Sequence, residues 1–173
     1  MNSNDILLAK AKEYCPICDK EHEVEKRKRK SKLEVKDLIV EYDEIYFRCA
    51  ETQDEENEFV TSEMMDNNLL NAKDNYRRQK KLLTSQDIKE IRKKYGLTQA
   101  EFSFLLGLGE ITITRYEKKL IQDETYDKIM RLVNDNVFLA LDYLKNNKEK
   151  SKNIKRYKEI ENNIKCILEK ISI

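Results

Sequence analysis

Three cysteines in the first third of the chain have a spacing suited to binding a metal ion. Cys15 and Cys18 form a C-x-x-C pair, and Cys49 follows later in the chain. A C-x-x-C turn can place both sulfurs on one tetrahedral ion while its backbone N–H groups point at the sulfurs. A second such pair would need a cysteine where the chain has Thr52. His22, in a C-x-x-C-x-x-x-H arrangement, is therefore the best fourth ligand.

Other ligands remain open for this site. Glu51 and Asp54 are poorer ligands than the histidine, and a water molecule is a further alternative. A small sheet that folds without metal is also compatible with the incomplete pattern. Because the chain holds one histidine and shows no open catalytic shell, any bound Zn²⁺ is expected to be structural.

Short strands are expected around these cysteines. Val, Ile, Tyr and Phe alternate or cluster over residues 22–30, 32–40 and 45–49, as in strands with one packed face. Residues 66–83 then predict a helix that links this β domain to the rest of the chain. Residues 51–66 carry seven acidic side chains and no basic one, which suits either a solvated loop or a docking surface for a basic partner.

Charge differs between the two parts of the chain. Residues 26–32 hold six basic side chains, which a solvated hairpin would explain. Over longer stretches, residues 1–80 have a net charge of −4 and residues 81–173 a net charge of +5. The basic second part permits nucleic-acid binding without requiring it.

A run of helix signals follows in the second half. Thr84 or Ser85 caps a helix that Gly96 ends, and Thr98 and Glu101 stand at capping-box spacing at the start of the next helix. A glycine-containing turn at 107–109 leads to a third helix over 110–118. Two short helices joined by such a turn indicate a helix-turn-helix.

The segment LTQAEFSFLLGLGEITITRYEKK resembles the Xre/Cro-type helix-turn-helix. The positions that fit its usual pattern are Leu97, Thr98, Gln99, Phe102, Ser103, Leu106, Gly107, Gly109, Thr112, Ile113, Thr114, Arg115, Tyr116 and Glu117. Together with the CPxC module, small sheet and linking helix, this arrangement is similar to MqsA/YgiT-type antitoxins, and to the N-terminal parts of SocA/Panacea-type antitoxins. The resemblance covers about residues 12–147, and Thr52 departs from the family's fourth cysteine.

In such domains the third helix lies in the major groove with its N-terminal residues at the base edges. Arg115 is suited to a bidentate pair with guanine, Ile111 to a thymine methyl group, and the start of the second helix to phosphate. The DNA-binding residues expected are Glu110, Ile111, Thr112, Thr114, Arg115, Gln99 and Thr98. Glu117 is expected to pair with Arg92 rather than with a base.

Most apolar residues of the motif are expected in its core, namely Leu97, Phe102, Leu106, Leu108, Ile113 and Tyr116, with Ser103 beside them. Phe104 stands where relatives usually have a polar residue, which suggests contact with another module or a second subunit. A fourth helix with Tyr126, Ile129, Met130 and Val133, and a fifth with Val137, Phe138, Leu141 and Leu144, close the domain.

The last helix carries an apolar seam at 3-4-3-4 spacing, formed by Tyr157, Ile160, Ile164, Ile167 and Ile171. It either packs back on the fold or pairs in a dimer. Dimerisation is expected on separate grounds, because operators are commonly read as two half-sites by a two-fold dimer. Cys166 lies beside the seam and is not expected to bind metal.

The fold class predicted is α+β: a zinc-ribbon-like β domain (1–65), a linking helix (66–83), a five-helix helix-turn-helix domain (84–147) and an amphipathic helix (148–173). Neither a secretory signal nor a membrane span is evident, so we expect a cytoplasmic protein. No nucleophile–base pair, phosphate loop or catalytic metal shell can be assembled, so an enzyme is not expected.

The resemblance implies a repressor of its own promoter that acts as the antitoxin of a type II toxin–antitoxin pair and binds the toxin through its N-terminal domain. Two alternatives remain open at this point. One is a phage or mobile-element repressor without a toxin, and the other is an adaptor that inhibits a protein through its acidic loop.

Overall fold

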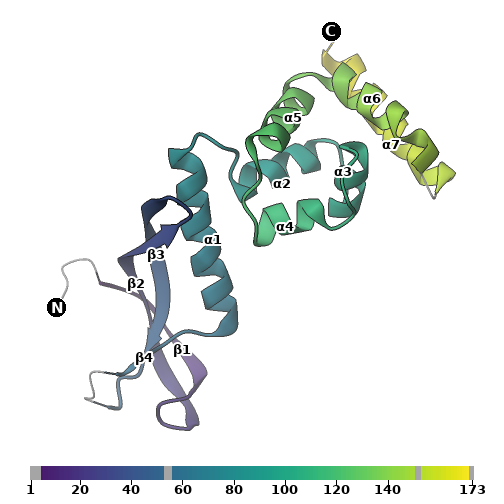
Figure 1. Ribbon diagram of the computed structural model, residues 1–173. Coiled ribbons are helices and arrows are strands. Elements are labelled where there is room, and N and C mark those ends of the chain that lie inside the picture. The colour runs from purple at the N-terminus through teal and green to yellow at the C-terminus, as the bar shows by residue number, and fades with distance from the viewer. Residues whose placement is uncertain (1–4, 53–55, 151–152, 172–173) are drawn as a thin grey trace. The chain divides into compact units, whose positions relative to one another are not determined.

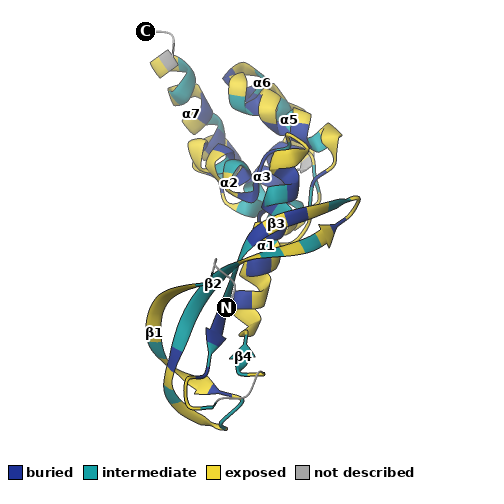
Figure 2. Ribbon diagram, turned by 90° about the vertical axis from the view of Figure 1, so that its left-hand side faces the viewer, coloured by how far each residue is buried: buried dark blue, intermediate teal, exposed yellow. Residues whose placement is uncertain are grey.

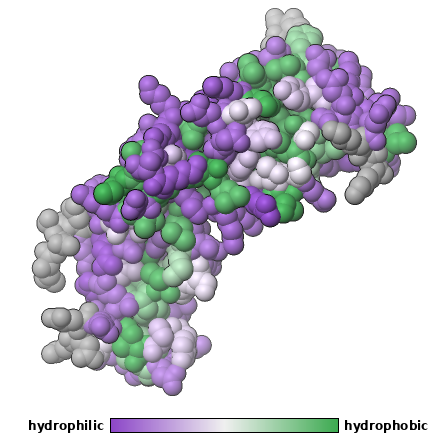
Figure 3. Space-filling view, in the orientation of Figure 1, coloured by the Kyte–Doolittle hydropathy of each residue, from purple (hydrophilic) through white to green (hydrophobic). Residues whose placement is uncertain are grey.

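The computed structural model describes residues 5–52, 56–150 and 153–171. Its contacts divide the chain into two compact units, Met1–Gln79 and Lys80–Ile173. The N-terminal unit holds the β-sheet and one helix, and the C-terminal unit is entirely helical (Figure 1). The fold is therefore α+β. The surface in Figure 3 is largely hydrophilic over both units, as expected for a chain in which 39% of residues are charged.

The N-terminal sheet is antiparallel and has four strands in the order β1-β2-β3-β4. Their bounds are β1 Ile6–Cys15, β2 Lys20–Val35, β3 Leu38–Arg48 and β4 Glu58–Phe59. One cluster of buried residues holds the metal-site end of this sheet together, and its members are Cys15, Val24, Phe47, Cys49 and Met64. The small β domain thus forms as expected.

The strand pattern differs from the expected one at a turn and in two strands that were not expected, β1 and β4. Residues 32–40 do not form one strand, because a tight turn at Lys36 and Asp37 divides them between β2 and β3. Lys36 has φ +55°, a left-handed conformation that such turns require. The first strand, Ile6–Cys15, was not expected, since its large apolar residues are consecutive.

The helix expected as a linker is part of the N-terminal unit. Helix α1 spans Ser62–Gln79 and packs along β3. The Asn68 side chain accepts a hydrogen bond from the Ile45 backbone N–H (2.9 Å) and donates one to the Ile45 carbonyl (2.7 Å). Further along the helix, Tyr76 Oη donates to Asp37 (3.0 Å). The helix therefore covers the edge of β3 that β4 leaves unpaired.

The C-terminal unit contains six α-helices and one short 3₁₀-helix in its described residues. Their bounds are α2 Ser85–Lys94, α3 Gln99–Leu105, α4 Thr112–Lys118, α5 Glu124–Asp135, α6 Val137–Asn146, η1 Lys148–Lys150 and α7 Ile154–Ile171. Figure 2 shows the buried residues gathered on the inner faces of these helices. Leu97, Phe102, Ser103, Leu106, Ile113 and Tyr116 are buried as expected, and Leu108 is half-buried.

The last helix packs back on its own domain. Tyr157, Ile160 and Ile164 of the apolar seam belong to the same buried cluster as the helix-turn-helix core, and Ile167 packs against it. The side chain of Ile171 lies outside the described residues. Arg156, at the start of α7, forms two hydrogen bonds to Glu101 of α3 (2.6 and 3.1 Å). The seam is thus covered within one chain.

Two side chains depart from the expected pattern. Phe104 is half-buried against the core of its own domain, which removes the need for another module to cover it. Phe138 is exposed although it was expected on the inner face of α6, because Asn136 caps that helix and Val137 takes the inward position. Among the described residues, no helix is both long and apolar enough to cross a bilayer.

Candidate nucleic-acid interface and metal site

Helices α3 and α4 form a helix-turn-helix whose geometry is set by local capping. Thr98 caps α3: its hydroxyl accepts from the Glu101 backbone N–H, and the Glu101 carboxylate accepts from the Thr98 N–H. Gly107 follows the helix with φ +71°, a conformation that favours glycine. Inside the motif, the buried Ser103 hydroxyl accepts from the backbone N–H of Ile113 (3.2 Å). This bond holds the start of α4 against α3.

A buried carboxylate joins three elements of the motif. Glu117 of α4 accepts two hydrogen bonds from the Arg92 guanidinium of α2 (2.6 and 3.0 Å), so the expected pair forms. It also accepts one from Gln99 Nε2 of α3 (2.6 Å). The other end of the same amide, Gln99 Oε1, accepts from the Thr114 hydroxyl (3.0 Å). The amide and the carboxylate therefore fix the rotation of α4 relative to α2 and α3.

The outer side of α4 is where the expected base-contacting residues lie. Ile111 is 54% exposed, and Glu110 and Arg115 are exposed. Ile111, Thr114 and Arg115 stand three and four positions apart, so they share one helix face. Thr112 and Thr114 are half-buried. Helix α4 begins at Thr112 and not at Glu110: Ile111 is its N-cap, and the Ile111 carbonyl accepts a hydrogen bond from the Arg115 backbone N–H (3.0 Å).

The two residues expected at phosphate differ in their surroundings. Thr98 is exposed at the start of α3, but its hydroxyl is engaged in the capping box. The Gln99 side chain is engaged at both ends, by Glu117 and Thr114. Sequence reasoning missed these two hydrogen bonds, since they join residues 15 and 18 positions apart.

The proposed metal ligands come together in the N-terminal unit. The ligand atoms of Cys15, Cys18, His22 and Cys49 all lie within 4.8 Å of one another. Cys49 Sγ is 3.3 Å from Cys18 Sγ and 3.7 Å from His22 Nε2. Cys15 and Cys49 are fully buried, and His22 and Cys18 are half-buried. The pairing of β1 with β2 and of β2 with β3 brings these residues together.

Charged groups beside the cluster affect its ligands. His22 Nδ1 lies 3.2 Å from Glu51 Oε1, close enough for an ion pair although not aligned as a hydrogen bond. This contact leaves Nε2 facing the sulfurs, as a carboxylate–histidine–metal arrangement requires. Glu51 also pairs with Lys20 (2.5 Å). Glu51 therefore lies behind the histidine, and Asp54 lies outside the described residues.

The thiols of the cluster share a hydrogen bond. The hydrogen bond with Cys49, together with burial, raises the pKa of Cys18 to about 11. Burial acts to raise the pKa of Cys49, but the hydrogen bonds from Cys18, Cys15 and the backbone of Glu51 and Thr52 outweigh it and lower that pKa. Three sulfurs and one imidazole nitrogen form a donor set that Zn²⁺ accepts in closed structural sites.

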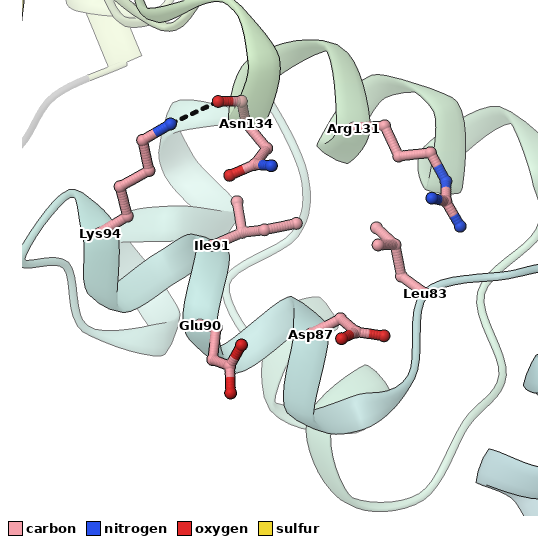
Figure 4. Close-up of a pocket in the computed structure, with 7 residues that line it drawn as sticks. All are labelled: Leu83, Asp87, Glu90, Ile91, Lys94, Arg131 and Asn134. Atoms are coloured by element: carbon pink, nitrogen blue, oxygen red, sulfur yellow. Dashed lines mark hydrogen bonds between the residues drawn. The ribbon is translucent and has the colours of Figure 1, made fainter. Parts of the chain in front are cut away.

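A shallow cavity of about 380 Å³ lies between α2 and α5. Figure 4 shows its lining residues, which are Leu83, Asp87, Glu90, Ile91, Lys94, Arg131 and Asn134. Its polar groups already have partners within the domain. Lys94 donates to the Asn134 carbonyl, Arg131 pairs with Asp127, and Asp87 completes the cap of α2. The cavity therefore offers no group reserved for a ligand.

Comparison with known proteins identifies the central part of the chain. No curated protein and no solved structure matches the chain significantly. Residues 88–132 match the family model described as Helix-turn-helix. The matched segment runs from within α2 to within α5 and includes all of α3 and α4. Residues 88–132 are therefore a helix-turn-helix domain, the DNA-binding part of a transcription regulator.

Proposed function

We propose that this chain is a sequence-specific repressor of its own promoter, with α4 as the recognition helix. The observation that supports this most is that Ile111 and Arg115 are exposed on one face of a helix that Glu117 holds in place, with the half-buried Thr114 beside them. Within the described residues, no hydrogen bond or ion pair engages the guanidinium of the exposed Arg115. That group is therefore available for a guanine. The function that we propose is DNA binding and not catalysis.

A titration of the full chain on its own upstream DNA, at fixed salt, tests this proposal. Replacing Arg115 with Ala should weaken specific binding by about 1–3 kcal/mol, or about 5- to 150-fold, because a bidentate base contact is lost. Lys128→Ala is the matched control, since Lys128 is an exposed cation of α5 with only a 3.7 Å surface pair to Glu124. Equal affinity for upstream and random DNA would contradict the proposal.

The finer role that we propose is that of a type II antitoxin whose N-terminal unit binds and neutralises a toxin. It is supported by the similarity of the cysteine module and helix-turn-helix to MqsA/YgiT-type antitoxins. The protein encoded beside this gene should arrest growth when it is expressed alone. Co-expression of this chain should relieve the arrest. Arg115→Ala should keep the relief but lose the repression. If the chain gives no relief, the role is that of a regulator alone.

We also propose that Cys15, Cys18, His22 and Cys49 hold a structural Zn²⁺. Zn²⁺ supplies a cross-link here: it would tie the end of β1 to β2 and to the residue after β3. The donor chemistry and the mutual distances fit a four-coordinate ion. The carboxylate of Glu51 beside His22 supports the same assignment.

A homodimer is part of this proposal, since one helix-turn-helix contacts few base pairs. The seam of α7 is covered by its own domain, so the dimer would use another surface. Leu132 and Phe138 are exposed apolar side chains near the junction of α5 and α6. They are the residues on which we expect self-association to depend. The cytoplasm is the compartment that we propose for such a protein.

A further inference from the structure

The two edges of the N-terminal sheet differ. On one side, β4 pairs with Phe47 and Arg48 of β3. The Asn68 amide of α1 forms hydrogen bonds with the backbone N–H and carbonyl of Ile45 on the same side. On the other side, β1 pairs only with β2. Across the described ranges 5–52, 56–150 and 153–171, no segment pairs with the outer edge of β1. Its outward N–H and C=O groups are therefore available to another strand.

Strand β1 is also exposed to solvent over most of its length. Ile6, Leu7 and Leu8 are 53%, 46% and 46% exposed, and of the ten residues of the strand only Cys15 is buried. Figure 2 shows the strand as largely exposed. Proteins commonly protect such an edge with proline, a short strand, a bulge or charges. Here protection consists of a bulge between Leu7 and Ala9 and of three charges: Lys10 and Lys12 on one face and Glu13 on the other.

Those lysines argue against pairing of β1 with a second copy of itself. Strands related by a two-fold axis pair antiparallel, and residues that lie opposite each other point to the same face of the sheet. From Ala9 to Cys15, Lys10 and Lys12 share one face, opposite Glu25 and Glu23 of β2. Self-pairing centred on Lys10, Ala11 or Lys12 then places a lysine opposite a lysine. Like charges directly opposite are destabilising.

The same lysines favour a strand with acidic residues. Lys10 and Lys12 already contact Glu23 (3.0 Å) and Glu21 (3.9 Å) on the β2 side. An acidic residue on the outer side would extend this alternation of charge across three strands. The N-terminal end of β1, with Ile6, Leu7 and Leu8, would take apolar side chains. The charges and apolar residues along β1 thus indicate which strand would pair with it: one with acidic residues at one end and apolar residues at the other.

We propose that the outer edge of β1 binds an extended segment of a second protein, which adds to the sheet as an antiparallel fifth strand. The segment carries acidic side chains at alternate positions opposite Lys10 and Lys12, followed by apolar side chains opposite Leu7 and Ile6. Backbone hydrogen bonds supply affinity, and the lysines supply selectivity. This inference rests on the proposed partner-binding role of the N-terminal unit, and the segment would belong to the toxin.

The probe is a capped peptide of sequence Thr-Glu-Val-Glu-Val-Ile-Val-Thr, titrated against the full chain by fluorescence anisotropy. One control peptide has lysine in place of both glutamates, and another has proline in place of the central valine. The acidic peptide should bind at least tenfold tighter than either control. Hydrogen exchange should slow within residues 6–14 and stay unchanged in residues 80–171.

Charge reversal gives the decisive comparison. The double variant Lys10→Glu with Lys12→Glu should invert the preference, so that the lysine peptide binds tighter than the acidic one. The new carboxylates lie opposite Glu25 and Glu23 of β2, but both positions are exposed and solvent screens the repulsion, so the variant should still fold. Lys10→Gln with Lys12→Gln, which adds no like-charge pair, should bind the two peptides with equal affinity. Lys32→Glu is the matched control, since Lys32 is an exposed lysine of β2 away from β1, and it should leave the preference unchanged.

Equal affinity for the acidic and lysine peptides would overturn the inference, as would slowed exchange outside β1. A dimer of the free chain that Leu8→Lys dissociates would also overturn it, because a second copy would then occupy the edge. The peptide experiment uses neither DNA nor toxin. Selective peptide binding with no relief of toxicity would therefore contradict the antitoxin role alone, and relief without peptide selectivity would contradict this inference alone.

Discussion

At the scale of single residues, the structure depends on charges that are paired inside the helix-turn-helix. Glu117 is buried, and the Arg92 guanidinium and the Gln99 amide satisfy it. The pairing with Arg92 was predicted from the motif and is confirmed. A buried carboxylate is costly to leave unpaired. Because the partners of Glu117 come from α2 and α3, this cost favours one arrangement of the three helices. The face of α4 that we assign to DNA is oriented by this buried carboxylate.

A second ion pair makes stability depend on pH. Hydrogen bonds from Arg156 lower the pKa of Glu101 to about 2. A carboxylate whose pKa is lower in the folded state stabilises the fold above its unfolded pKa of about 4.3, and this stabilisation is lost as pH falls toward 2. We expect Glu101→Gln to lower the free energy of unfolding by about 1–2 kcal/mol at pH 7 and by almost nothing at pH 2. The effect at pH 7 is modest because Arg156 is partly exposed and solvent screens the pair.

Urea denaturation of both proteins at several pH values measures this difference. Gln retains the capping box with Thr98, so the change isolates the ion pair with Arg156. A difference in the free energy of unfolding that does not shrink with acid would contradict the assignment.

At the scale of elements, α7 completes the core of the C-terminal unit. Its seam resembles a short coiled-coil stripe in sequence, and either a dimer or an intramolecular contact would satisfy it. The structure places Tyr157, Ile160 and Ile164 in the core formed with α6. Residue pattern alone does not separate these outcomes, because a second chain and a neighbouring helix offer the same apolar surface.

Truncation of a seam residue should therefore destabilise the monomer and leave the oligomeric state unchanged. Ile164 is fully buried, and we expect Ile164→Ala to cost about 2–4 kcal/mol of unfolding free energy through lost contacts and a cavity. Ile154→Ala, at a side chain that is 70% exposed on the same helix, should change stability by less than about 0.5 kcal/mol. Sedimentation velocity and thermal melts give both quantities. Dissociation of a dimer by Ile164→Ala at constant fold would place the interface on α7.

At the scale of the whole molecule, the metal site and the DNA-binding helices lie in different compact units. Strands β1, β2 and β3 meet at the cysteine cluster, so the Zn²⁺ that we propose there would supply much of the stability of this small β unit. The helical unit has its own core of nineteen buried hydrophobic residues. Loss of metal should therefore act on one unit and spare the other.

Chelation gives the corresponding prediction. Removing Zn²⁺, or replacing Cys18 with Ser, should lower the melting temperature of the N-terminal unit and abolish stoichiometric zinc. Affinity for promoter DNA should change less than about twofold, because the cysteine cluster and the helix-turn-helix belong to different compact units with separate cores. Cys166→Ser, at an exposed cysteine outside the cluster, is the control and should keep one zinc per chain. Purified protein without zinc, or an equal loss of DNA affinity, would contradict the prediction.

Much of this molecule was predictable because the signals are local. The cap expected at Thr84 or Ser85, the capping box at Thr98, glycines after helices and the spacing of Ile113 and Tyr116 specify α2 to α4 within a few residues each, and Thr84 is the residue that caps α2. The family match over 88–132 confirms the helix-turn-helix. Strand β1 was missed, because its large apolar residues Ile6, Leu7 and Leu8 are consecutive and the alternation that follows uses alanine, which is uncommon in strands. Pairing with β2 determines its conformation.

The amino-acid sequence by itself determined the helix-turn-helix, the C-x-x-C turn and most of the apolar face of each helix after α1, Phe138 of α6 excepted, because capping, turn chemistry and helical spacing act between neighbours in the chain. Contacts between distant residues determined the rest. Only folding brings Cys49 to Cys18, binds Gln99 between Glu117 and Thr114, covers the seam of α7 and leaves the edge of β1 open. Each depends on which surfaces meet in three dimensions, and one-dimensional spacing does not encode that choice.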